Sequence, residues 1–263
     1  MLMNKLIIRQ GYPWLQTLEE HKAPLWKRLL AGLTERISYV VADSIIVTTE
    51  MDKKRIIEKY GIEEPKIHVI PNYVDTDLFK PDPSQRIPKR ILYVGRIAQE
   101  KNLTSLLLAT ESLDVELRMV GEGEQKPYLV AMASYGITNV KFLGKIENED
   151  LVQEYQKADM FILPSYYEGN PKALLEAMAC GCIVIGTNVR GIKELVEDGE
   201  TGFLCPELSH SSITLTINRA LFMIREHPEI TDKIRENARN TITANNSLKE
   251  TVRREICMLR ELK

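Results

Sequence analysis

The sequence lacks the cysteine pattern of a zinc protein. Only four cysteines occur among the 263 residues, none of them forms a Cys-x-x-Cys pair, and no His-rich segment accompanies them. This pattern argues against a structural zinc site. Cys180 and Cys182 lie in an apolar run, which is typical of buried free thiols. A reducing, cytoplasmic location fits this cysteine usage.

An excess of charge and long apolar runs are also missing. The formal net charge is -2, so we expect no nucleic-acid partner, which would require a basic surplus or stripe. No apolar stretch approaches the roughly 20 residues that cross a bilayer, and Met1 to Gln10 does not resemble a signal peptide. Trp26, which stands among leucines and cations, allows a peripheral membrane contact, but a helix packed on the core is the favoured interpretation.

The glycine fingerprints of common nucleotide sites are incomplete. Gly121 and Gly123 follow an apolar run, but Lys126 occupies the third glycine position of the dinucleotide motif. The chain also contains no Gly-x-x-x-x-Gly-Lys-Ser/Thr sequence. Binding of NAD and of ATP in a P-loop is therefore unsupported, and an NAD-dependent reductase is disfavoured.

Short β-branched runs alternate with longer helical patterns. Most of the runs are continuously apolar, which is the pattern of parallel strands buried on both faces. We therefore predict right-handed βαβ units in an open, doubly wound α/β sheet. The expected strands are Leu6–Ile8, Ser44–Thr48, His68–Ile70, Arg90–Val94, Glu116–Val120, Val140–Leu143, Met160–Leu163 and Ile183–Gly186. The expected helices are Leu25–Ala42, Met51–Tyr60, Leu103–Ser112, Gln125–Tyr135, Asp150–Ala158, Pro171–Ala179, Ile192–Val196, Ser211–Arg225, Ile230–Ile242 and Leu248–Leu262.

A proline-rich stretch divides the chain. Residues 71–88 contain four prolines and are expected to be a hinge. We expect residues 1–70 to form a partial α/β domain and residues 89–245 to form one complete Rossmann-like domain. The remaining helix, residues 246–263, is expected to cross back to the first part.

Two cations follow the strand that ends at Val94. Gly95 allows the chain to turn at the carboxyl edge of the sheet, where ligands of open α/β sheets bind. Arg96 and Lys101 would then point into that crevice, where two cations suit a diphosphate. The alternative interpretation of this motif alone is two ordinary surface cations near a strand end.

The run from Pro164 to Glu176 carries the strongest signal. A helix is expected to begin near Pro171, with the N–H groups of the next three residues forming an anion site. Gly169 would let backbone and ligand approach closely. Glu168 precedes the helix and Glu176 lies in its second turn, so the two carboxylates are suited to sugar hydroxyls. The alternative is a loop cap and a solvated helix residue, but a carboxylate among apolar neighbours needs a partner.

Taken together, these motifs resemble the family 4 glycosyltransferases, which are retaining enzymes with the two-domain GT-B architecture. The likeness covers residues 44–204, and no single motif decides it. Tyr73 departs from the family, which often has glycine there, and the family's glycine-rich N-terminal loop is not found in this sequence. The matching segments are Ile70–Asp75, Tyr93–Arg96 with Lys101, Val120–Gly123, Phe142–Gly144, Ala158–Asp159, Glu168–Gly181, Glu194–Val196 and Asp198–Leu204.

The resemblance implies a role for each matching position. Arg96 and Lys101 would neutralise the donor diphosphate, Glu168 would hold hydroxyls of the transferred sugar, and Glu176 would bind the ribose. Neither a metal nor another cofactor is expected, because cations and helix N–H groups supply the electrostatic stabilisation. The remaining implied donor contacts are Gly95 and Gly121 at strand ends, Phe142, Leu143 and Pro164 around the base, and Gly169, Asn170, Pro171, Lys172, Ala173 and Leu174 around the pyrophosphate and sugar.

Three functional hypotheses follow. The first is a glycosyltransferase that moves a sugar from a nucleoside diphosphate to a glycan or lipid-linked acceptor. The second is a nucleotide-sugar binding module that requires a partner chain for transfer, docked on the apolar segment Leu25 to Val41. The third is a sugar-nucleotide epimerase of the same architecture. It is disfavoured because the two glutamates with seven residues between them argue against it.

Overall fold

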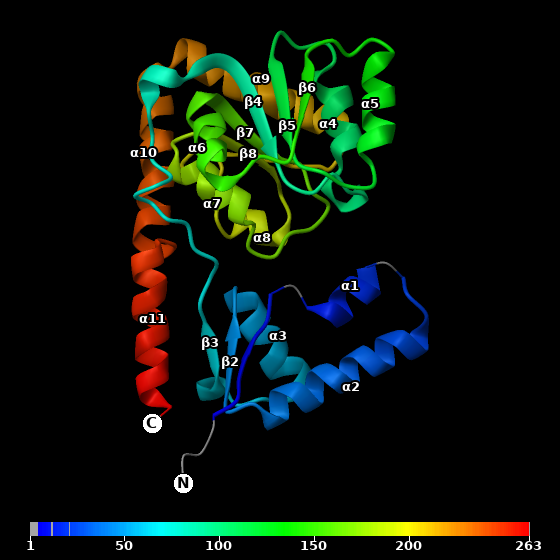
Figure 1. The fold of residues 1–263 in the computed structure, drawn as a ribbon, viewed down its shortest axis with the longest axis vertical. Helices are drawn as coiled ribbons and strands as arrows, with labels where there is room; N and C mark the ends of the chain where they lie inside the picture. The colour runs from blue at the N-terminus through cyan, green and yellow to red at the C-terminus, as the bar shows by residue number, and fades with distance from the viewer. Residues whose placement is uncertain (1–4, 12, 21, 263) are drawn as a thin grey trace. The chain divides into compact units, whose positions relative to one another are not determined.

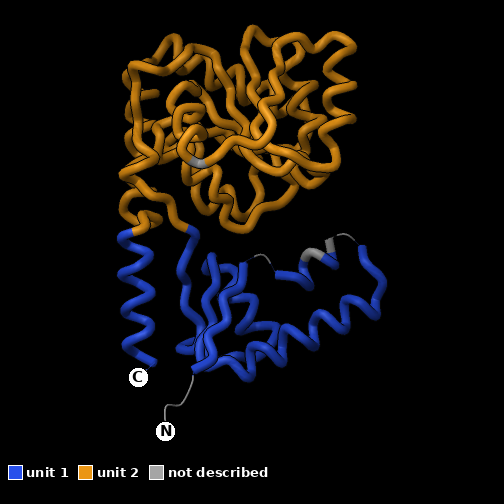
Figure 2. Tube along the Cα trace, in the orientation of Figure 1, with its two compact units in different colours: residues 1–72, 249–263 blue, residues 73–248 orange. Residues whose placement is uncertain are grey.

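The structure is a computed structural model, and it describes residues 5–11, 13–20 and 22–262. These residues belong to two compact units, shown in different colours in Figure 2. Unit 1 contains residues 1–72 and 249–263, and unit 2 contains residues 73–248. Both units are built from parallel strands joined by helices (Figure 1), so the expected α/β class is confirmed.

Unit 2 is built on a sheet of six strands in the order β6-β5-β4-β7-β8-β9, all of them parallel to their neighbours. The chain starts in the middle at β4, moves outward to β6, and then returns to β7 beside β4. Connections on the two sides of the β4–β7 pair therefore run in opposite directions, and ligands of such sheets bind outside the carboxyl ends of these two strands. The strands are β4 (Ile87–Val94), β5 (Glu116–Val120), β6 (Val140–Gly144), β7 (Ala158–Leu163), β8 (Ile183–Thr187) and β9 (Phe203–Cys205).

The centre of this sheet is fully covered. Every residue of β7 and β8 is buried, as expected for parallel strands with helices on both faces. Helix α4 packs against α9, and α7 packs against α10. Burial raises the pKa of the Cys182 thiol to about 12 and that of the Cys205 thiol to about 11. The helices are α4 (Leu103–Thr110), α5 (Lys126–Ser134), α6 (Asn148–Lys157), α7 (Lys172–Ala179), α8 (Arg190–Lys193), α9 (His210–Glu226) and α10 (Pro228–Asn245).

Unit 1 has a smaller parallel sheet with the strand order β1-β2-β3. Its core is formed by Ile45, Val47 and Ile56 with their neighbours. A second, small cluster joins Ile46 and Ile70 to Met258 of the last helix. The elements are β1 (Ile7–Arg9), α1 (Trp14–Glu20), α2 (Leu25–Val41), β2 (Ser44–Val47), α3 (Glu50–Tyr60), β3 (Ile67–Val69) and α11 (Leu248–Glu261).

Two elements, β9 and α1, were not predicted from the sequence. Strand β9 has only three residues and follows a tight turn in which Gly199 N–H donates to the Gly202 carbonyl at 2.7 Å, so no long apolar run marks it. Helix α1 has only seven residues, too few to show a clear helical pattern in the sequence. Strand β4 also begins at Ile87, three residues before the expected Arg90, because Pro88 is accommodated near the strand start.

In the described part of the chain, no helix is long and apolar enough to cross a membrane.

Candidate functional site

A cation and a carboxylate that are far apart in sequence meet at the carboxyl ends of β4 and β7. Lys101, in a single 3-10 turn after β4, places its Nζ 2.6 Å from Oε1 of Glu168, in the loop after β7. The Ser165 hydroxyl donates to the same oxygen at 2.6 Å. Both charged side chains are largely buried, with 18% and 10% exposed. The pair therefore lies where the sheet topology places a ligand site.

The second predicted cation is held by a neighbouring carboxylate. Arg96 forms an ion pair with Glu100, which raises the pKa of the guanidinium. The Arg96 side chain is 68% exposed, so it lies open to an incoming ligand. The Glu100 carbonyl accepts from the Tyr166 N–H at 2.9 Å, which links the loops after β4 and β7. Each cation is thus paired with one carboxylate. A bound diphosphate would interact with both cations alongside their carboxylate partners.

Glycines allow the backbone of adjacent loops to touch at this edge. Gly121 has a φ of +138°, and a Cβ there would lie 1.9 Å from the Gly95 carbonyl oxygen. A Cβ at Gly191 would lie 1.9 Å from the Gly169 carbonyl oxygen. Gly95 and Gly121 directly follow strands of the sheet, and a Cβ at Gly121 or Gly191 would overlap the backbone that it touches. The predicted site glycines therefore set the spacing of the loops.

The start of α7 differs in detail from the prediction. The helix begins at Lys172, and Pro171 is the capping residue before it. Leu174 N–H donates to the Pro171 carbonyl at 3.1 Å, so the expectation that this N–H would be available to a ligand is wrong. A tight i to i+3 bond closes the first turn and takes up this donor. The N–H groups of Lys172 and Ala173 precede the first helical hydrogen bond and can face an anion.

The second glutamate of the pair is buried. Glu176 is 6% exposed, and the Tyr155 hydroxyl of α6 donates to its Oε2 at 2.9 Å. Lys172 Nζ lies 3.9 Å from its Oε1. Burial raises the pKa of Glu176, while the Tyr155 hydrogen bond and the Lys172 charge oppose that rise. The interpretation as a solvated helix residue is therefore wrong, and the expected partner is a tyrosine.

This raised pKa predicts a pH-dependent effect of Glu176→Gln. Between the ordinary pKa of 4.5 and the raised value, the folded state binds more protons than the unfolded state, so this group's stabilisation is lost as the pH rises. The glutamine side chain keeps an acceptor for Tyr155 but does not ionise. We expect the variant to gain stability relative to wild type as the pH rises above 4.5, as measured by urea unfolding. Glu147→Gln, on an exposed loop, is the control, and an equal response of the two variants would contradict the prediction.

The remaining predicted residues are distributed along the same edge of the sheet. Phe142 and Leu143 belong to the outer strand β6, whereas Pro164 directly follows β7 and is buried. Strands β5 and β4 separate β6 from β7 in the sheet, so the proposed base-contacting residues do not form one cluster. Asn170 is half-buried between Gly169 and the start of α7. Lys172 also lies 5.9 Å from the ring of Tyr73, the residue that departs from the family pattern.

Three partners of the site residues were not identified from the sequence. Ser165 lies three residues before Glu168, and Glu100 lies four residues after Arg96, so their spacings could have indicated them. Tyr155 lies 21 residues before Glu176 on a different helix, and no local pattern marks that contact. In the part of the chain that the structure describes, no group of three His, Cys, Asp or Glu side chains is placed to hold a metal ion.

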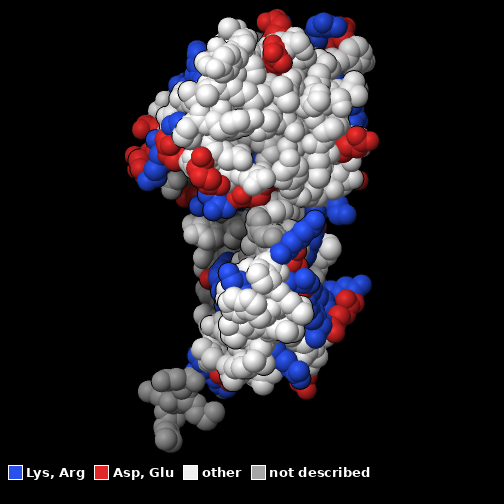
Figure 3. Space-filling view, turned by 90° about the vertical axis from the view of Figure 1, so that its right-hand side faces the viewer, with Lys and Arg blue, Asp and Glu red and all other residues white. Residues whose placement is uncertain are grey.

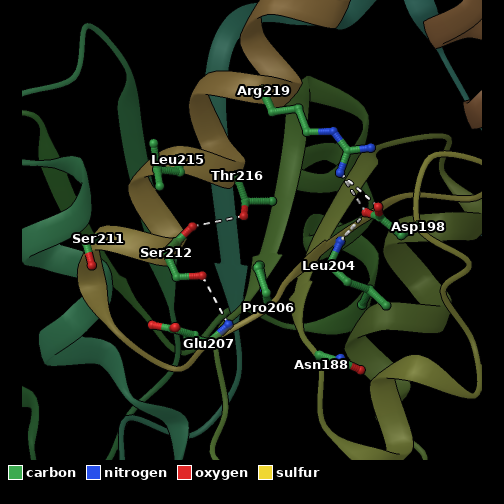
Figure 4. A pocket seen from close by; sticks show the side chains of 10 residues that line it. All are labelled: Asn188, Asp198, Leu204, Pro206, Glu207, Ser211, Ser212, Leu215, Thr216 and Arg219. Carbon is green, nitrogen blue, oxygen red and sulfur yellow. Dashed lines mark hydrogen bonds and ion pairs between the residues drawn. The ribbon is translucent and has the colours of Figure 1, made fainter.

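A hollow opens beyond the carboxyl ends of β8 and β9 (Figure 4). It measures about 540 Å³, and Asn188 and Glu207 lie at its border. Arg219 donates to both oxygens of Asp198 at 3.0 and 2.9 Å across one side. The Ser212 hydroxyl accepts from Glu207 N–H at 3.1 Å. Because these polar groups satisfy one another, the hollow gives no reason to expect a particular ligand.

Proteins of known structure share this fold. Sucrose-phosphate synthase from Thermosynechococcus elongatus superposes with a TM-score of 0.82 at 24% identity, over 97% of this chain and 67% of that protein. Anabaena HepE in complex with UDP and glucose superposes with a TM-score of 0.81 at 21% identity, over 98% and 72% respectively. At these identities the likeness concerns the fold, and it confirms the expected GT-B class.

Curated relatives match parts of the sequence. A D-inositol 3-phosphate glycosyltransferase from Mycobacterium sp. (strain KMS) is 34% identical over 183 residues, which is 62% of this chain and 41% of the relative. A glycogen synthase from Mycobacterium tuberculosis (strain H37Rv) is 27% identical over 226 residues, which is 80% of this chain and 54% of the relative. The chain thus spans about half the length of these relatives.

Two family models match the chain. The model for Glycosyltransferase Family 4 matches residues 11–78, and the model for Glycosyl transferases group 1 matches residues 75–241, which is more than half of the chain. The second match includes the Lys101–Glu168 pair, Arg96 and the buried Glu176. Because this model matches more than half of the chain, the chain belongs to the group 1 glycosyl transferases.

Proposed function

We propose that unit 2 binds a nucleoside-diphosphate sugar at the carboxyl ends of β4 and β7 and that the protein transfers this sugar to an acceptor hydroxyl in glycan or glycolipid synthesis. The observation that carries the proposal is the largely buried Lys101–Glu168 pair at the switch point of the sheet. In this reaction the bond between the anomeric carbon and the diphosphate oxygen breaks. A bond from that carbon to the acceptor oxygen forms, and the acceptor proton leaves with the departing diphosphate or solvent.

The side chains present suit such a donor. Lys101 and Arg96 supply two positive charges for a leaving group that becomes more negative as the bond breaks, and the first N–H groups of α7 add to them. Glu168, held by Lys101 and Ser165, offers a carboxylate to sugar hydroxyls. Glu176, near the same helix start, is assigned to the ribose. No metal is required for this stabilisation, because the protein's own cations provide it.

The finer features of the proposal come from the family resemblance. Retention of the anomeric configuration belongs to it because the family 4 enzymes that the motifs resemble are retaining. HepE was solved in complex with UDP-glucose, which makes a UDP-sugar the first donor to test here. We further place the reaction in the cytoplasm, with the acceptor either a glycan or a lipid-linked molecule reached by peripheral membrane contact.

As the alternative, we propose that this chain binds the nucleotide sugar at the same Lys101–Glu168 site but requires a partner chain for transfer. Donor binding without transfer, followed by transfer when a partner is added, would favour this alternative.

Calorimetric titration with a panel of UDP-, GDP- and ADP-glucose tests the donor site. We expect one base to be preferred, with Lys101→Ala weakening binding by about 10- to 100-fold, because a hydrogen bond to a charged group contributes about 1.5–3 kcal/mol. Lys141→Ala is the matched control, since Lys141 also pairs with a glutamate but lies at the amino end of the sheet strands. A folded protein that binds no member of the panel, or equal losses in both variants, would rule out the proposed site.

A further inference from the structure

Helix α2 in unit 1 directs most of its large apolar residues outward, whereas a surface helix normally buries them. The buried residues along it are Ala31, Glu35 and Tyr39. Figure 3 shows a broad area of uncharged side chains on the visible face of unit 1, bordered by Lys and Arg. Eight large apolar side chains of α2 are 50 to 66% exposed: Leu25, Trp26, Leu29, Leu30, Leu33, Ile37, Val40 and Val41.

Hydrogen bonds to a buried carboxylate fix this orientation. Glu35 accepts from the Leu15 N–H at 2.9 Å and from the Tyr60 hydroxyl at 2.7 Å. Arg55 lies 3.6 Å from the same carboxylate. Rotating α2 to bury its apolar face would break all three contacts and leave a carboxylate without them. The apolar face is therefore directed away from unit 1 by the unit's own packing.

The exposed residues follow the spacing of a helix-to-helix seam. Trp26, Leu30, Leu33, Ile37 and Val40 are separated by four, three, four and three residues. Alternation of three and four is the pattern by which the apolar side chains of one helix interdigitate with those of another. This spacing indicates a helical partner rather than an irregular one.

The exposed apolar face as a whole, rather than the seam alone, can also pack against a reversed copy of itself. A second α2 running antiparallel and centred on Leu33 would bring Leu29 opposite Ile37, and Trp26 opposite Val40. The large Trp26 of one copy thus meets the smaller Val40 of the other. Arg36 would face Leu30, against which its aliphatic stem can pack. Such a two-fold arrangement uses the same patch on both copies, as an isologous interface requires.

We propose that α2 is a dimer interface and that its occupant is α2 of a second copy of this chain, packed antiparallel about Leu33. Eight side chains at this exposure offer an area on the order of the ~800 Å² that each partner contributes to a stable interface. A membrane surface presents no side chains that interdigitate with the three-four spacing of this seam, whereas a second α2 does. The proposal stands on unit 1 and does not depend on the proposed transferase activity.

The test is sedimentation velocity of the full chain from about 1 to about 100 µM, with substitutions at the centre of the seam. We expect the wild type to be a dimer. Leu33→Glu and Leu33→Arg place like charges opposite each other across the axis, so each alone should weaken association at least about 100-fold. Mixing the two variants should restore the dimer, because each glutamate then faces an arginine. Leu33 is 56% exposed and both replacements favour helix, so the fold is retained, as circular dichroism can verify.

The matched control is Leu215→Glu, which introduces the same charge at an exposed leucine of unit 2 and should leave the dimer intact. A wild-type monomer at the highest concentration overturns the proposal, including one that instead co-sediments with phosphatidylglycerol vesicles. A dimer that persists in both Leu33 variants also overturns it, because the interface then lies elsewhere. Failure of the mixture to re-form a dimer rejects the antiparallel register about Leu33.

Discussion

Replacing Glu168 by glutamine is expected to lower the rate of sugar transfer by about 10- to 100-fold, because a hydrogen bond to a carboxylate that contributes about 1.5–3 kcal/mol is weakened. The same change should leave the affinity for the bare nucleoside diphosphate unchanged or raise it. Glu168 lies 2.6 Å from Lys101 Nζ, so removing its charge leaves Lys101 more available to phosphate. Kinetics with the preferred nucleotide sugar, together with calorimetry of its diphosphate, separate the two effects.

Glu116→Gln is the matched control for this experiment. Glu116 also accepts from a lysine, Lys141, at 2.8 Å, but it begins β5 at the opposite end of the strand from the proposed site. We expect this variant to transfer sugar at the wild-type rate. Parallel losses of diphosphate and nucleotide-sugar affinity in Glu168→Gln would instead assign Glu168 to the phosphate region and contradict a role at the sugar.

Gly121→Ala is expected to destabilise the protein by about 3–5 kcal/mol, which combines strain at an unfavourable φ with overpacking. The residue has a φ of +138°, and its new Cβ would lie 1.9 Å from the carbonyl oxygen of Gly95. Relief requires the loops after β4 and β5 to separate. Because Arg96 directly follows Gly95, donor binding should weaken as well. Urea unfolding measures the first effect, and titration of the folded variant measures the second.

Gly136→Ala separates strain from steric overlap. Gly136 has a φ of +140°, but a Cβ there meets nothing within 4 Å. The control should therefore lose only about 1–2 kcal/mol, the cost of backbone strain alone. If both alanine variants lose the same free energy, the close approach of Gly95 and Gly121 does not contribute to stability.

The sequence was most informative where one local pattern determines one local structure. Apolar runs predicted eight of the strands to within three residues at each end, because burial on both faces removes the polar alternation. Glu168 was predicted to lie in a loop at the carboxyl edge, and it does. Its pairing with Lys101 joins residues 67 apart, and only the strand order brings them together.

Other features depend on tertiary packing, which the sequence patterns do not reveal. The helix that begins at Leu25 was expected to pack on the core, and it does so through Ala31, Glu35 and Tyr39 rather than through its leucines. The environment of Glu176 likewise depends on Tyr155, which arrives from another helix. The N–H of Leu174 was assigned to a ligand because helix starts usually leave it unpaired, yet a tight first turn uses it.

The burial of the thiols has a practical consequence for labelling chemistry. Cys180, Cys182 and Cys205 are buried and have raised pKa values, so they remain protonated and shielded from alkylating reagents near neutral pH. Cys257 on α11 is the exposed member of the four. A maleimide fluorophore should therefore attach to the unaltered protein at this one position. Its anisotropy would then report self-association without any engineered cysteine.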